Sequence, residues 1–227
     1  MKRANFKTIY VTVICLIITL LCGCSLFVTD KDKFILDDKH ENLLVWIDLD
    51  KTGSDVVIPS KVGDITVREI YLADPYYSKI DSLDVSNVKK LESFTLKLFN
   101  KNTGSKLKKL DFSKNNKLRH IEITQTKALK IIKFNSTCES IYLKEISIKK
   151  VDLKKLKKLI RFTYREGSLE ELDISNNQNL ESIKIVDSNV KKLDVSHNPK
   201  LKYILIDEGT EVIGPTNAYI EYNKRTE

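Results

Sequence analysis

The chain has few of the residues that mark catalysis, redox chemistry or metal binding. Its 227 residues include four cysteines, three histidines, one methionine and one tryptophan. His40, His120 and His197 are far apart, with no cysteine or carboxylate at the spacing of a metal site. No GxSxG, HExxH, P-loop or CxxC motif is present. These absences predict a protein that is not an enzyme and that holds neither a metal nor another cofactor.

The chain also lacks an apolar run long enough to cross a bilayer. The run from Ile9 to Leu21 has 13 residues, whereas a spanning helix needs about 20. It follows a basic start, as in a secretory signal peptide. It ends in the residues LCGCS from Leu21 to Ser25, which resemble the bacterial lipobox. That resemblance implies cleavage before Cys24 and lipid on Cys24; the alternative is an ordinary signal or an uncleaved anchor.

Loss of that signal would leave two cysteines, Cys24 and Cys138. With lipid on Cys24 no intramolecular disulfide is possible, and Cys138 fits a small buried hydrophobe. The formal charge of +8 would fall to +5, because the signal carries three basic residues and no acid. Mild charge and export together argue against a nucleic-acid partner.

The main feature of the sequence is an internal repeat. Segments of the form LxxIxI begin at Leu91, Leu118, Cys138, Leu159, Leu180 and Leu201, and the last three steps are 21 residues each. Such a period is typical of a solenoid, in which units stack because one alone cannot bury its apolar edge. A step of 21 would also suit three heptads, but the β-branched and aromatic residues of these segments favour strands.

A second set of segments alternates with the first. Segments such as KLDFS, ELDIS and KLDVS carry their apolar anchors at Leu110, Leu172 and Leu193. Their Asp, Ser and Asn residues favour turns, because these side chains bond to their own backbone. Each unit is therefore expected to have two apolar stripes on opposite sides of the coil.

The LxxIxI units resemble leucine-rich repeats over residues 68–206. The resemblance implies a coil with one short parallel strand per turn on its concave side, and places the LDxS segments on the convex side. The chain departs at the ninth position, where the family has Asn and this chain has Gly167 and Ser188 among others. Its asparagines lie instead in the convex turns, at Asn115, Asn116, Asn176, Asn177 and Asn198.

Residues 51–70, KTGSDVVIPSKVGDITVREI, resemble the BspA-like leucine-rich-repeat surface proteins of bacteria. We therefore expect a β-rich solenoid with a parallel concave sheet, little helix and β caps at both ends, with Trp46 in the core of the first cap. The expected segments are a signal peptide (1–23), a lipidated cysteine and tether (24–35), an N-terminal β cap (36–67), the repeats (68–206) and a C-terminal cap (207–227).

Strand alternation predicts which side chains face outward. Positions four and six of each LxxIxI segment should point into the core, and positions three, five and seven outward. In the middle of the face these include the predicted ligand-binding residues Tyr142, Lys144, Arg161, Arg165, Lys184 and Tyr203. The alternative is an ordinary solvated sheet face. The lysine-rich residues 149–158 are expected to form a solvated convex face, or to contact anionic lipid or wall polymer.

Together these features predict a monomeric, lipid-anchored binding module of the bacterial cell envelope. It would recognise a protein or glycan through the concave sheet face, without catalysis. The alternative is an envelope scaffold or inhibitor that acts on a partner of the same cell. Lipid on Cys24 would hold it on the outer side of the cytoplasmic membrane, or alternatively at the outer membrane.

Overall fold

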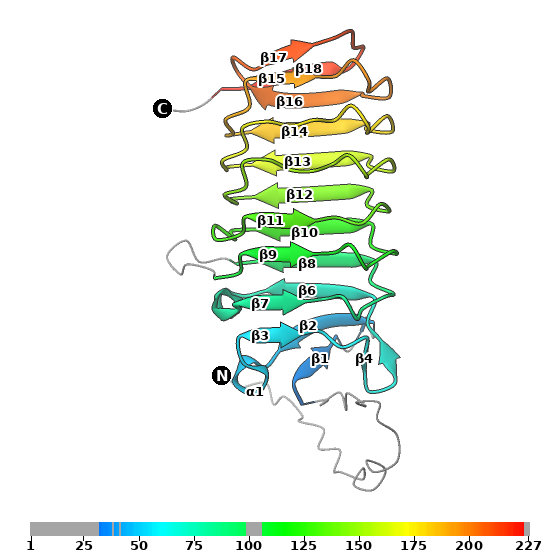
Figure 1. The fold of residues 1–227 in the computed structure, drawn as a ribbon, viewed down its shortest axis with the longest axis vertical. Helices are drawn as coiled ribbons and strands as arrows, with labels where there is room; N and C mark the ends of the chain where they lie inside the picture. Colours follow the sequence, from blue (N-terminus) through cyan, green and yellow to red (C-terminus); the bar gives the residue numbers. More distant parts are fainter. Residues whose placement is uncertain (1–31, 38, 41, 99–105, 225–227) are drawn as a thin grey trace, which may run out of the picture.

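The computed structural model describes residues 32–37, 39, 40, 42–98 and 106–224. Its coils are stacked in sequence order, from β1 at one end to β18 at the other (Figure 1). The predicted signal peptide, the lipobox with Cys24 and most of the tether lie outside the described residues.

One ten-stranded sheet runs the length of the stack. Neighbouring strands are parallel throughout, except that β1 pairs antiparallel with β2. In sheet order the strands are β1 (Phe34–Leu36), β2 (Leu43–Ile47), β6 (Glu69–Ala73), β8 (Ser93–Lys97), β10 (His120–Thr124), β12 (Ser140–Lys144), β13 (Arg161–Arg165), β14 (Ser182–Val186), β16 (Tyr203–Asp207) and β18 (Tyr219–Asn223).

The other side of each coil is less regular. Its short parallel pairs are β3 (Asp55–Val57) with β7 (Ser82–Asp84), β9 (Lys109–Asp111) with β11 (Ile131–Lys133), and β15 (Lys192–Asp194) with β17 (Glu211–Ile213). The units of Val151 and Leu172 have only an isolated bridge from Lys150 to Glu171. A hairpin of β4 (Lys61–Val62) and β5 (Ile65–Thr66), the one-turn helix α1 (Leu49–Thr52) and the 3-10 helix η1 (Pro75–Lys79) complete the described elements.

The predicted solenoid is confirmed: the protein is mostly β, with one long parallel sheet and almost no helix. Equivalent inward side chains stack from coil to coil, and each is at most 2% exposed. At position four this row is Ile70, Phe94, Ile121, Ile141, Phe162, Ile183 and Ile204. The apolar slots of the repeat therefore form one continuous core.

Asparagine side chains tie successive coils together, although at a different place from the family pattern. Asn177 Nδ2 donates to the carbonyl oxygens of Leu153 (3.0 Å) and Leu156 (2.9 Å) in the preceding coil. The ladder consists of four buried asparagines: Asn115, Asn135, Asn177 and Asn198. The ladder thus satisfies backbone carbonyls in the turns that precede the strands of the ten-stranded sheet, rather than those near the ninth position.

The side chain of Tyr164 accounts for Gly167, the glycine at the ninth position of its repeat. It takes an inward slot and is fully buried, and burial raises its pKa to about 12. Its hydroxyl donates to the Ile146 carbonyl (2.9 Å) and accepts from the Leu169 N–H (3.1 Å). A Cβ at Gly167 would collide with that hydroxyl. The tyrosine therefore occupies the space that a ninth-position side chain would need.

Trp46 differs from its expected place in the core. It is half-buried and lies parallel to Tyr76, with ring centroids 5.3 Å apart. Tyr77 meets it edge-on at 5.8 Å. The residues that fill the core at this end are Leu44 and Ile47 of β2, which are fully buried. Trp46 therefore packs against the core from outside.

Candidate interaction surface

The outward side chains of the ten-stranded sheet form three rows, called here the sheet face. Strand pairing aligns Tyr142, Thr163, Lys184 and Leu205 at position five. Arg161 lies beside Ser140 and Ser182, and Tyr203 follows Ser182 in the same row. The six residues predicted to bind a ligand thus come from four adjacent strands, β12, β13, β14 and β16.

The prediction that side chains at position seven point outward is wrong in three strands. Thr124, Val186 and Asp207 are buried, the last two at 1% and 3% exposure. The Asp207 carboxylate accepts the N–H groups of Asp187 (2.8 Å) and Ser188 (3.0 Å) in the preceding coil. The Asp207 side chain is therefore turned toward the preceding coil, and strand alternation does not predict the burial of these three side chains.

An acidic row beside the sheet face neutralises part of its positive charge. Lys144 Nζ lies 3.1 Å from Glu166 and 3.7 Å from Glu145, and the bond to Glu166 raises the Lys144 pKa. Glu145 and Glu166 follow their strands with positive φ angles of 51° and 54°. That left-handed conformation is uncommon outside glycine, and a pattern of alternating strand residues does not reveal it.

Aromatic contacts order the C-terminal part of the sheet face. Lys184 Nζ lies 5.3 Å from the centre of the Tyr203 ring, which stacks on Tyr219 with centroids 6.2 Å apart. The Tyr203 hydroxyl donates to Glu221 Oε2 (2.5 Å), and this bond raises the Tyr203 pKa to about 12. Tyr219 is itself 67% exposed. The two rings give this end a broad, accessible aromatic platform.

Arg161, Arg165 and Lys184 are the cations of the site that hold no ion pair with a carboxylate among the described residues, and the two arginines of β13 also lack an aromatic contact there. Arg161 is exposed, and Arg165 is half-buried with its Nε shielded from solvent and without a hydrogen-bond partner in that part of the chain. A guanidinium group binds carboxylates and phosphates with a fixed two-pronged geometry. The middle of the sheet face can therefore take up an anionic group.

A second aromatic cluster, which the sequence did not reveal, lies at the N-terminal end. Trp46, Tyr71 and Tyr77 help to line an open hollow of about 450 Å³. The Tyr77 hydroxyl accepts the Ile47 N–H (3.2 Å), so this ring also supports β2. Lys97 Nζ lies 5.7 Å from the Tyr71 ring centre and pairs with a glutamate of the next strand.

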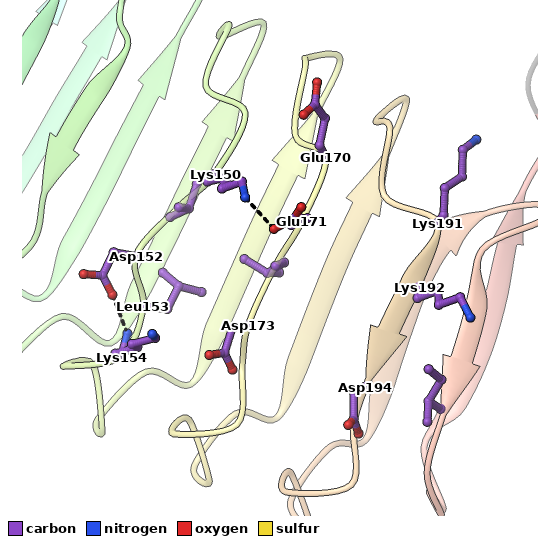
Figure 2. A pocket seen from close by; sticks show the side chains of 13 residues that line it. Lys150, Asp152, Leu153, Lys154, Glu170, Glu171, Asp173, Lys191, Lys192 and Asp194 are labelled. Atoms are coloured by element: carbon purple, nitrogen blue, oxygen red, sulfur yellow. Dashed lines mark hydrogen bonds and ion pairs between the residues drawn. The ribbon is translucent and has the colours of Figure 1, made fainter.

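Another hollow lies on the opposite face, and its polar side chains have structural roles (Figure 2). It measures about 810 Å³, and Asp152, Asp173 and Asp194 recur along it on successive coils. Asp173 Oδ1 accepts the Ser175 hydroxyl (2.6 Å) and N–H (3.0 Å), which lower the Asp173 pKa. The aspartates of the LDxS motif therefore shape turns.

Within the described ranges, no group of three or more His, Cys, Asp or Glu side chains is placed to hold a metal ion. No helix in that part of the chain is long and apolar enough to cross a membrane. Cys138 is buried, its Sγ lies 2.8 Å from Asn135 Oδ1, and burial raises its pKa to about 12. These features suit a packed thiol rather than a nucleophile.

The fold and surface define an all-β solenoid of the leucine-rich-repeat type that presents one long sheet face. No model of a known protein family matches the chain, and no curated protein sequence matches it significantly. Among solved structures it is similar to the functional domain of InlJ from Listeria monocytogenes, which includes a cysteine ladder. Identity is 13% and the TM-score 0.26, over 69% of this chain and 49% of that one. The chain thus spans about half the length of the chain it matches.

Proposed function

We propose that this protein is a lipid-anchored binding module of a bacterial cell envelope, which recognises a protein or glycan through its sheet face without catalysis. One observation carries the proposal: Tyr142, Arg161, Lys184 and Tyr203 lie on four adjacent strands and the same side of a rigid sheet. Tyrosine and arginine are the residues that most often anchor interfaces.

The size of the sheet face suits a macromolecular partner. Seven strands from β6 to β16 at about 4.8 Å spacing extend over roughly 30 Å. A face of that length is long enough to hold a standard protein interface, which buries about 800 Å² on each partner. The hollows described above are open to solvent, whereas small-molecule sites bury most of the ligand's surface.

The proposed anchor predicts a change of location. Replacement Cys24→Ser should move the protein from the membrane to soluble or unprocessed fractions. Two or more acyl chains give stable attachment because each buried methylene contributes about 0.8 kcal/mol. Cell fractionation with a mass measurement of the protein tests this. A Cys24→Ser protein that stays on the membrane with the mature mass and lipid label of the wild type would contradict the anchor.

The proposed site predicts a loss of binding on charge reversal. A photoreactive residue in place of Thr163, at the centre of the sheet face, should crosslink the partner on intact cells. With that partner, the double variant Arg161→Glu and Lys184→Glu should bind at least about tenfold more weakly, because a cation that contacts an anionic group becomes repulsive. Titration calorimetry gives the affinity, and thermal unfolding should change little.

The matched control reverses Lys127 and Lys130, two exposed lysines in a turn away from the sheet face. This variant changes the net charge by the same amount but leaves the sheet face intact, so its affinity for the partner should stay near that of the wild type. Equal losses in the two double variants would show that net charge alone drives binding and would remove the sheet face as the site. A partner from the same cell would favour the envelope scaffold or inhibitor, whereas a partner from outside the cell would favour a binding module for adhesion.

A further inference from the structure

Six stacked turns lie along one edge of the solenoid; four of them carry lysines, and none contains an Asp or Glu residue. They precede strands β8, β10, β12, β13, β14 and β16 and comprise residues 86–90, 113–117, 134–137, 154–158, 175–179 and 196–200. Every lysine in them is exposed. These nine residues, the lysine strip, are Lys89, Lys90, Lys114, Lys117, Lys154, Lys155, Lys157, Lys158 and Lys200.

The lysine strip gathers in one place many lysines that hold no ion pair in the described part of the chain; Lys200 Nζ instead donates to Asn179 Oδ1 (2.6 Å). Elsewhere lysines bridge to glutamates of the next coil, as in Lys149–Glu170 (2.8 Å), Lys150–Glu171 (2.7 Å) and Lys192–Glu211 (3.0 Å). Within the described residues, none of the nine strip lysines forms an ion pair with a carboxylate. Such a concentration of like charge is self-repulsive, so it indicates a surface that meets an anion.

The opposite edge, at the far ends of the same strands, carries both signs of charge. Lys127 and Lys130 follow β10 there, whereas Glu145, Glu166 and Asp187 follow the next strands. The edge with the lysine strip therefore carries a local excess of positive charge, whereas the opposite edge is mixed.

The lysine strip is also straight and firmly supported. The asparagine ladder runs through the same turns and bonds each to a neighbouring coil, as Asn115 does to Val85 (2.9 Å) and Asn198 to Ile174 (2.9 Å). Five steps of about 4.8 Å give the six turns a length of roughly 25 Å. The strip thus forms a flat row of flexible ammonium groups on a rigid base.

We propose that the lysine strip docks the solenoid lengthwise on an anionic lipid bilayer. Lysine acts as a point charge on a flexible stem, which suits many laterally mobile headgroups, whereas fixed anion sites favour arginine. The hollow beside the strip is lined by Glu139 and Glu181 as well as by Lys158 and Lys200, and this mixed charge does not favour a soluble polyanion. The proposal rests on the proposed membrane anchor, which would hold the strip close to the surface.

The test uses the mature protein from cell membranes, incorporated through its proposed lipid on Cys24 into vesicles of phosphatidylcholine alone or with one-third phosphatidylglycerol. An impermeant acylating reagent modifies exposed lysines, and mass spectrometry gives the rate at each residue. With phosphatidylglycerol the strip lysines should react at least about fivefold more slowly, and high salt should remove this protection. Lys108, Lys127, Lys130 and Lys191 are exposed lysines outside the strip and should react unchanged.

Charge-reversal variants distinguish an effect of the lysine strip from an effect of the protein's net charge. Reversal to glutamate of Lys154, Lys155, Lys157 and Lys158 should restore the reaction at Lys89 and Lys117, whereas the matched reversal of Lys108, Lys127, Lys130 and Lys191 should not. Equal protection of all exposed lysines would overturn the proposal, as would protection by soluble polyphosphate but not by phosphatidylglycerol. A chain that fails to enter phosphatidylcholine vesicles at all would instead count against the proposed anchor.

Discussion

Replacement of Ile183 by alanine is expected to lower the free energy of unfolding by about 2–5 kcal/mol, as large-to-small changes in protein cores do. Ile183 is fully buried and lies between Phe162 and Ile204, its equivalents in the neighbouring coils. Because each coil contacts only its neighbours, loss of this side chain weakens the stacking on both sides. Urea unfolding followed by circular dichroism measures the change.

The neighbouring residue supplies the control. Lys184 points out of the same strand, and Lys184→Ala should cost only about 0.5–1 kcal/mol, the value of an exposed contact between a cation and an aromatic ring. A loss at Lys184 as large as that at Ile183 would refute the strand phase and every assignment to the sheet face.

The asparagine ladder should be the second large contributor to stability. Replacement Asn177→Ala removes a donor from the carbonyl groups of Leu153 and Leu156. A buried carbonyl left without a partner costs about 1–3 kcal/mol, so we expect a loss of roughly 2–4 kcal/mol. The comparison is Asn176→Ala, one residue earlier and exposed, which should change the free energy by at most about 0.5 kcal/mol. Similar losses at the two positions would mean that the ladder bonds do not stabilise the coil.

The periodicity of the sequence predicted most of the fold. The 21-residue step aligned Phe162, Ile183 and Ile204 as they lie in the sheet, because stacked coils must bury equivalent side chains together. The six residues predicted for the sheet face also share one side of four adjacent strands. Their role in binding stays a prediction.

The sequence pattern could not predict features that depend on the third dimension. The bonds of the asparagine ladder run between residues 17 to 30 positions apart, so only the stacking of the coils shows that these side chains reach the preceding turn. The inward turn at Asp207 and the pairing of Lys144 with Glu166 depend on the path of the backbone after each strand. The sequence singled out only the four strip lysines within residues 149–158, because the other five are spread over three further turns.

A deletion of one complete coil tests the central claim, that 21 residues make one turn of the solenoid. Removal of residues 160–180 takes out 21 residues and joins Leu159 to Glu181, so β14 should pair with β12 in the register that β13 now has. We predict a folded, slightly less stable protein with cooperative thermal unfolding and β-type circular dichroism. Removal of residues 160–170, about half a coil, should abolish the cooperative transition, because every later segment would face the wrong side. Equal unfolding behaviour of the two deletions would contradict the account.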